Sequence, residues 1–188
     1  RSDEYYLILP DEIRLNYEIS SHNCDDKENL SYKGATSRGT PVYVNSLFND
    51  ATLKIVVGDI EPHHFAGFSG GVKSAAIGLC GRETINTNHK YFTNENAKVG
   101  VYQNNPLRQD IEDIGKIIGV DFALNAILDE EKNILKVYFG KPLDVMKEGI
   151  RFSRSLSFIP ISKHYDFVIA SAGGYPKDIN FYQAQKAL

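Results

Sequence analysis

Two histidines, a run of glycines and a lysine fall within fourteen residues of this chain, from Glu61 to Ser74, in the sequence EPHHFAGFSGGVKS. We call this segment the signature loop. Imidazole is a suitable general base near neutral pH, and glycines allow backbone angles that are closed to other residues. A lysine amine becomes nucleophilic when its pKa is lowered. The segment therefore predicts a site that cradles an anion and positions a base and an amine.

The glycines of this loop precede a predicted helix that starts near Gly71 and ends near Leu79. Free amides of Ser69, Gly70 and Gly71 at a helix start would converge on one point and favour an anion there. Lys73 would lie in the first turn, where positive surroundings lower its pKa. The alternative is a tight strand-to-helix turn with a solvated lysine.

Two phosphate-binding motifs compete for the same residues. The GxxxxGK[ST] spacing of a P-loop fails because Val72 separates Gly71 from Lys73. The SGGVKS run resembles the SGGxDS loop of ATP pyrophosphatases, although a lysine takes the place of the acidic residue. That loop also follows its strand directly, whereas here about a dozen residues intervene. An ATP-pyrophosphatase-like protein stays an alternative.

The elements that must position these residues alternate between strands and helices, which predicts an α/β fold. A polar stretch, 20–40, carries no predicted element, and the strand at 53–57 is expected to be buried. Pro10 should break or restart the first helix. Strands are predicted at 42–47, 53–57, 120–128, 134–139 and 166–171, and helices at 4–19, 71–79, 83–93, 106–118, 142–156 and 178–187.

The end of the chain predicts a second α/β unit. Residues 157–165 resemble a linker, and a strand, a glycine pair and a helix follow it. We expect parts of two α/β domains with a cleft between them. Residues 1–158 would form most of an N-terminal domain whose upstream part is missing, and 159–188 the truncated start of a second domain.

Composition excludes several classes of protein. A net charge of −3 gives no electrostatic reason to expect a nucleic-acid partner. No apolar run is long enough for a membrane span, and the first residues are no signal peptide. Cys24 and Cys80 make no metal or redox spacing, so two free thiols in a reducing cytoplasm are expected.

The run HHFAGFSGGVK, with His89 downstream and Gln183 and Lys186 far downstream, resembles the lactate racemase family. Members of that family are isomerases that use a nickel-pincer nucleotide for hydride transfer. Segments 34–45, 105–125 and 171–186 also resemble the family's sequence, so the resemblance covers most of the chain.

The resemblance implies a role for each matched residue. Lys73 would form the covalent link to the pyridinium nucleotide, and His89, sixteen residues later, would bind the nickel. His63, ten residues before the lysine, would act as general base on the 2-hydroxyl of a small hydroxyacid, with His64 in a supporting or packing part. Gln183 and Lys186 would make polar contacts to the cofactor or substrate. The family's cofactor-maturation enzymes would be partners.

Read from their own surroundings, the same residues allow plainer interpretations. His89 follows Ile85 by four residues and precedes Phe92 by three, which predicts the apolar side of a helix and a buried core histidine. Gln183 and Lys186 would lie on an exposed helix surface. Asp59 and Glu61 flank the signature loop and could orient a histidine.

Departures from the family pattern define the remaining alternatives. An aspartate-arginine-proline segment and a glycine-histidine-arginine segment supply the family's carboxylate-binding arginine and second base, and neither occurs in residues 1–60. We therefore expect these 188 residues to be inactive alone. One alternative is a relative that acts on another hydroxyacid or a sugar acid, including as a redox enzyme. The other is a catalytically incomplete relative that only binds a nucleotide or phosphate.

Overall fold

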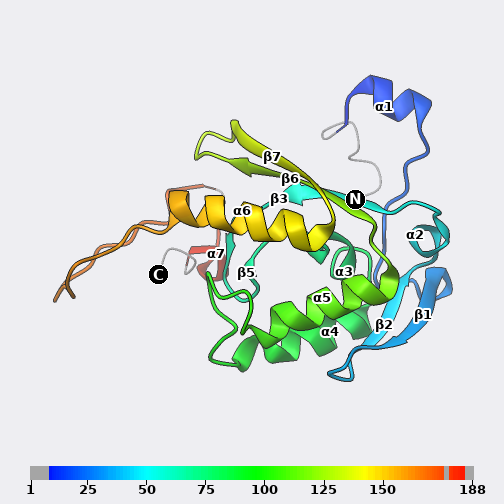
Figure 1. The fold of residues 1–188 in the computed structure, drawn as a ribbon, viewed down its shortest axis with the longest axis horizontal. Coiled ribbons are helices and arrows are strands. Elements are labelled where there is room, and N and C mark those ends of the chain that lie inside the picture. The colour runs from blue at the N-terminus through cyan, green and yellow to red at the C-terminus, as the bar shows by residue number, and fades with distance from the viewer. Residues whose placement is uncertain (1–8, 176–177, 185–188) are drawn as a thin grey trace.

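The structure is a computed structural model that describes residues 9–175 and 178–184, and Figure 1 shows their arrangement. Helices and strands alternate along the chain, and the predicted α/β class is confirmed. In chain order the elements are α1 (Asp11–Asn16), η2 (Lys27–Asn29), β1 (Leu30–Ala35), β2 (Pro41–Asn45), α2 (Ser46–Asp50), β3 (Ile55–Asp59), β4 (Pro62–His63), β5 (Gly67–Phe68), α3 (Lys73–Ala76), α4 (Arg82–His89), η3 (Lys90–Thr93), α5 (Pro106–Ile118), β6 (Phe122–Leu128), β7 (Ile134–Gly140), α6 (Pro142–Ser157) and α7 (Phe181–Ala184).

A three-stranded sheet in the order β3-β6-β7 organises the fold. Strands β3 and β6 are parallel, from the pair Ile55–Phe122 to the pair Asp59–Ala126, and β7 returns antiparallel to β6. The connection from β3 to β6 contains α3, α4 and α5. Because the signature loop begins where β3 ends, it lies at the carboxyl end of a parallel strand, where ligands of α/β proteins commonly bind.

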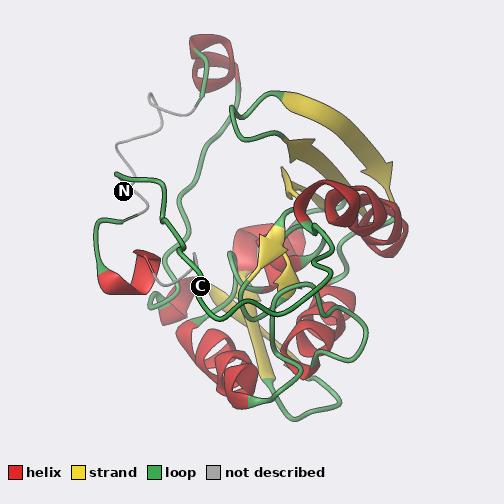
Figure 2. Cartoon of the chain, turned by 90° about the vertical axis from the view of Figure 1, so that its left-hand side faces the viewer, coloured by secondary structure: helices red, strands yellow, loops and turns green. Residues whose placement is uncertain are grey.

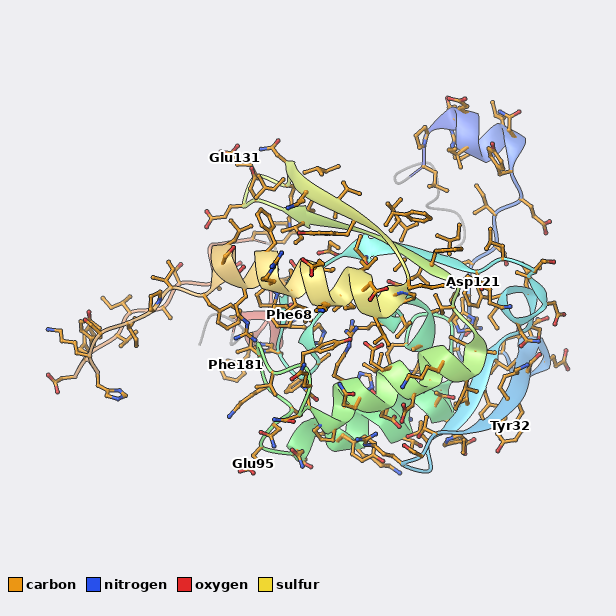
Figure 3. The ribbon with its side chains drawn as sticks, viewed as in Figure 1. Tyr32, Phe68, Glu95, Asp121, Glu131 and Phe181 are labelled. Carbon is orange, nitrogen blue, oxygen red and sulfur yellow. The ribbon has the colours of Figure 1, made fainter. Side chains whose placement is uncertain are left out.

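Helix α5 supplies much of the core and spans the predicted range. The Asn105 side chain caps its first turn by accepting from the amide of Arg108, Pro106 opens the helix, and Gly119 ends it with a φ of 74°. Its apolar stripe is buried, and α6 packs against β6 and β7. In Figure 3 the fully buried Phe68 lies between α6 and α5.

A smaller antiparallel pair, β1-β2, packs beside α4. Val42 and Val44 of β2 are fully buried, and the Tyr43 amide donates to the Thr84 hydroxyl of α4 at 3.0 Å. Strand β1 was not predicted because its sequence, LSYKGA, is polar. Backbone pairing with β2 forms the strand, and Tyr32 on it is 59% exposed at the edge of the molecule (Figure 3).

Several predicted elements differ in extent. Helix α1 begins directly after Pro10 and ends at Asn16, and residues 4–8 of the predicted helix lie outside the described residues. Helix α3 has one turn instead of the range 71–79. The predicted helix 83–93 is an α-helix to His89 followed by the 3-10 turn η3. The expectation that 53–57 is buried is wrong, because only Val56 of β3 faces the core.

The predicted buried strand at 166–171 is also wrong. Phe167, Val168 and Ile169 are 80%, 73% and 83% exposed, and the segment forms no strand (Figure 2). Its apolar, β-branched sequence favours a strand, but no described strand lies beside it to pair with its backbone. Among the described helices, none combines the length and apolar character that a membrane crossing requires.

Candidate functional site

The first part of the signature loop is a small hairpin that the sequence did not predict. Strand β4 pairs antiparallel with β5 through the pairs Pro62–Phe68 and His63–Gly67, so His64, Phe65 and Ala66 form its tip. The Gly67 carbonyl also accepts from the amide of Gly100 at 3.0 Å. The hairpin presents both histidines on a short, bonded backbone.

The second part is a glycine turn that enters α3, and its amides bond within the protein. The Ser69 amide donates to the Glu61 carbonyl and the Gly71 amide to Asn125 Oδ1, both at 2.9 Å. The amides of Ser69 and Gly71 are therefore not free to bind an anion, contrary to the prediction. Gly70 and Gly71 instead supply positive φ angles of 81° and 59°. A Cβ on Gly70 would lie 2.6 Å from Ile60, so the turn needs glycine for close packing.

Arg108 of α5 holds the loop from inside the core, and sequence reasoning missed it. Its side chain is fully buried and donates to the carbonyls of Phe68 at 2.9 Å and Gly70 at 3.1 Å. Its charge is paired with Glu112 at 2.7 Å. Charged residues are almost never fully buried unless paired. The available signal was an arginine and a glutamate four residues apart on the amphipathic helix 106–118.

Other buried polar residues complete this support. Asn105 Nδ2 donates to the carbonyls of Phe65 at 2.7 Å and Val101 at 3.0 Å, which fixes the hairpin tip to the start of α5. Asp110, also buried, accepts from Thr36, Thr40 and Asn88 and ties α5 to the β1-β2 turn and α4. The segment 105–125 thus contributes the framework of the signature loop.

The two adjacent histidines have different surroundings. Nδ1 of the half-buried His63 accepts from the amides of Ala66 at 3.2 Å and Phe65 at 3.4 Å, so in the neutral ring the proton lies on Nε2. Nε2 of His64 is buried and has no hydrogen-bond partner among the described residues, and its ring lies 5.6 Å from that of Phe65. A buried polar atom without a partner is uncommon in native proteins.

Lys73 is the first residue of α3 and is partly buried. Burial lowers the pKa of its ammonium, and repulsion from Arg108 lowers that pKa further, whereas Asp59 and Glu61 oppose the shift. The expected lowering of the Lys73 pKa is thus supported, but burial is its leading cause and not a helix start. Asp59 and Glu61 both act on this amine.

His89 lies at the carboxyl end of α4 and is exposed, so the prediction of a buried core histidine is wrong. The expected apolar face turns outward at this point, because Phe92 is itself 51% exposed. Nδ1 of His89 donates to the Ile85 carbonyl at 2.8 Å. This bond fixes the tautomer and leaves the lone pair of Nε2 available, an arrangement typical of histidines that bind metals.

Three of the predicted site residues lie in the signature loop, and the position of His89 is related to it through an aromatic contact. His63, His64 and Lys73 share one loop, and the ring of Phe65 at its tip lies 5.7 Å from that of Phe92, three residues after His89. Gln183 lies on the short helix α7 and is half-buried, and Lys186 falls outside the described residues. Within the described ranges, no group of three or more His, Cys, Asp or Glu side chains could hold a metal ion.

A cavity of about 710 Å³ lies elsewhere, between the β1-β2 pair and α4. Its walls include Cys24, Tyr32, Tyr43, Arg82 and Lys90, and none of the predicted site residues lines it. Arg82 also donates two hydrogen bonds to the carboxylate of Asp25, another lining residue. Because none of the predicted site residues lines this cavity, the signature loop remains the candidate site.

Comparison with known protein families identifies the family to which this chain belongs. Residues 1–100, just over half of the chain, match the family described as the lactate racemase N-terminal domain. The chain belongs to this family. The matched range includes the whole signature loop and His89.

Individual relatives extend the match beyond that range. The lactate racemase of Thermoanaerobacterium thermosaccharolyticum is 34% identical over 92% of this chain and 41% of its own length, and that of Lactiplantibacillus plantarum is 33% identical over 95% and 42%. This lactate racemase N-terminal domain family member therefore spans about two-fifths of the curated relatives it matches.

Solved structures share the fold. The lactate racemase apoprotein from Thermoanaerobacterium thermosaccharolyticum superposes with a TM-score of 0.86 at 34% identity, over 90% of this chain and 41% of that one. A protein from Thermotoga maritima superposes with a TM-score of 0.66 at 22% identity, over 84% of this chain and 43% of that one, which is a likeness of fold alone.

Proposed function

We propose that this chain is part of a 2-hydroxyacid racemase or epimerase that acts on a lactate-like substrate and carries a nickel-pincer nucleotide on Lys73. Membership of the lactate racemase N-terminal domain family supports the reaction class. The observation that carries the proposal is the Lys73 amine itself. It is partly buried, its pKa is lowered, and within the described structure it has no hydrogen bond or ion pair that would occupy it.

The residues present fit such a group. An amine with a lowered pKa is suited to a covalent link. His89 offers a neutral imidazole nitrogen whose partner nitrogen is already bonded to the Ile85 carbonyl, and imidazole together with sulfur donors suits nickel.

We assign His63 the role of general base. When bound, the nickel-pincer nucleotide supplies an acceptor and donor of hydride at the substrate carbon. His63 takes the proton of the 2-hydroxyl and later returns it. The ring must then accept through Nε2, with its own proton on Nδ1, so the two contacts to the Phe65 and Ala66 amides must open. These contacts are 3.4 and 3.2 Å long, at the weak end of hydrogen bonds, and the buried Ala66 amide needs another acceptor when they open.

The other residues of the predicted site have smaller parts in the proposal. Ser69, Gly70 and Gly71 shape the path from the hairpin to Lys73, and any contact of the Ser69 or Gly71 amide with a cofactor would require their present bonds to open. Gln183 and Lys186 would make polar contacts to the cofactor or substrate. The engaged amides give less support to the nucleotide-binding and ATP-pyrophosphatase alternatives, which both depend on a free glycine nest.

Location and partners follow from the same proposal. A small 2-hydroxyacid would be the substrate, and dedicated maturation enzymes would deliver the cofactor in the cytoplasm. Racemisation needs a base on each face of the substrate, and the second base of the family pattern is not found in residues 1–60. We therefore expect the 188 residues alone to show little turnover.

Intact-mass spectrometry tests the proposal. The chain is co-expressed with the cofactor-maturation enzymes, and Lys73→Arg and Lys98→Arg are compared with the parent. We expect an added mass of a few hundred daltons in the parent and in K98R but not in K73R, because arginine keeps the charge and lacks the amine. Metal analysis should find nickel in the parent and less in His89→Gln. An unmodified parent that still binds nucleotide would overturn the proposal in favour of a binding protein.

A further inference from the structure

We propose that Arg108 is a positioning residue for Lys73, because its guanidinium fixes the turn that leads to the lysine and sets a permanent positive charge near the amine. The effect on the free amine stands by itself, and its use in cofactor attachment rests on the proposed function. Nothing in the family match assigns a role to this arginine.

The geometry of Arg108 is directed at the turn. Its two terminal nitrogens donate to the carbonyls of Phe68 and Gly70, which precede Lys73 by five and three residues. Its Nε donates to Glu112 Oε1 at 2.8 Å, so the whole planar fork is used. The guanidinium also lies 4.9 Å from the centre of the Tyr102 ring. These contacts together hold the Arg108 side chain in a single conformation.

This position requires arginine rather than lysine. Two carbonyls and a carboxylate are arranged around one plane, and only a guanidinium has donors in that fixed fork. The turn is fitted to it in return, because a Cβ on Gly71 would lie 3.2 Å from Arg108 Nη2 and 2.6 Å from Met146. Any residue larger than glycine at position 71 would therefore collide with the side chains of Met146 and Arg108.

The charge of Arg108 acts on Lys73 in a definite direction. Repulsion between two nearby cations favours the neutral amine, and this effect adds to that of burial. Asp59 and Glu61 act in the opposite direction. Only the neutral amine has a lone pair with which to form a bond. Arg108 thus shifts the balance toward the reactive form while holding the backbone of the loop.

The test measures the neutral fraction of Lys73 in the cofactor-free chain. Acetic anhydride acylates neutral amines: nitrogen bonds to the acetyl carbon, acetate leaves, and the ammonium proton passes to water. The rate at Lys73 is followed against pH by peptide mass spectrometry in the parent, Arg108→Gln, Arg108→Lys and Asp59→Asn. Lys98, which is exposed, reports reagent activity within each sample.

Variants of opposite charge should move the pH midpoint in opposite directions. We expect R108Q to raise it and to slow labelling several-fold at pH 8, and D59N to lower it. R108K, which keeps the charge but not the fork, should leave the midpoint near that of the parent while amide hydrogen exchange of residues 68–72 accelerates. If R108Q is unfolded by circular dichroism, R108K and D59N still decide the outcome.

Two results would overturn the role of Arg108. One is an unchanged midpoint in D59N and R108Q, and the other is unaltered exchange of the turn in R108K. Neither readout needs the cofactor. A normal set of midpoint shifts combined with no adduct after co-expression would therefore count against the proposed function and leave the positioning role intact.

Discussion

Asn125 Oδ1, in the middle of β6, accepts a hydrogen bond of 2.9 Å from the amide of Gly71, which lies 54 residues earlier in the chain. The bond joins the central strand of the sheet to the turn that leads into Lys73. Both groups are buried, so the amide has no water to replace its partner. The bond thereby holds the turn that precedes Lys73 in a fixed position relative to the sheet.

Replacing this acceptor should be costly. We expect Asn125→Ala to lower the free energy of unfolding by about 1–3 kcal/mol, because the Gly71 amide would be left buried and unpaired. Urea denaturation measures the change. Asn86→Ala, at an exposed position of α4 with no described side-chain hydrogen bond, is the control and should change stability by less than about 0.5 kcal/mol. Equal effects of the two variants would show that the bond adds nothing.

Gly115 of α5 and Gly149 of α6 both pack closely against a neighbouring side chain, but the two neighbours differ in how easily they can move. A Cβ on Gly115 would lie 2.5 Å from Val72 Cβ, next to Lys73, whereas a Cβ on Gly149 would lie 2.2 Å from the terminal Cδ1 of Ile60. Alanine favours a helix over glycine by about 1 kcal/mol at either position. We expect Gly115→Ala to destabilise by roughly 1–3 kcal/mol, since Val72 is anchored by its backbone. Gly149→Ala should cost less, because Ile60 can rotate. Chemical denaturation that ranks them in the reverse order would contradict this account.

Sequence patterns predicted the elements that depend on local signals. Helix α5 has its cap, its proline and its terminal glycine within one segment, and the hairpin of β6 and β7 follows from two apolar runs around a polar turn. The strand β1 and the β4-β5 hairpin carry no such signal, because they form by pairing with another segment. The strand predicted at 166–171 failed for the same reason, since it has no described neighbour.

The candidate site shows the same division. The signature loop was found from its composition, but its support was not, because the fork of Arg108 and the amide of Asn125 act across 38 and 54 residues. The environment of His89 was misjudged because helical spacing gives the face of a residue and not whether a neighbour covers it. Only the fold shows that its Nδ1 is bonded to Ile85 and its ring is exposed.

The ion pair of Arg108 and Glu112 should matter far more than a surface pair. Removing one partner of a buried pair typically costs about 3–5 kcal/mol, because the other charge is left uncompensated. We expect a loss of this size for Glu112→Ala. The control is Glu148→Ala in α6, which breaks the exposed pair with Arg151 and should cost less than about 1 kcal/mol. The unfolding midpoints in urea provide the comparison, and similar losses in both variants would refute the importance of burial.

Lys73 should make stability depend on pH in a predictable direction. Its folded-state pKa is lowered by burial and by Arg108, so protonation of the amine opposes folding. The destabilisation is fully present below the folded pKa and disappears as the pH rises toward about 10.4, where an unfolded lysine also loses its proton. Lys73→Met removes the charge and should therefore stabilise the chain at pH 7 more than at pH 10.5.

Denaturation midpoints at the two pH values measure this difference, and Lys98→Met is the matched control. Lys98 is exposed, so its replacement should change stability by the same small amount at both pH values. A gain for K73M at pH 7 that shrinks at pH 10.5, with no such trend for K98M, is the expected result. If K73M is no more stable than the parent at pH 7, the amine is well solvated, and its proposed use as a reactive, partly buried nucleophile loses its physical basis.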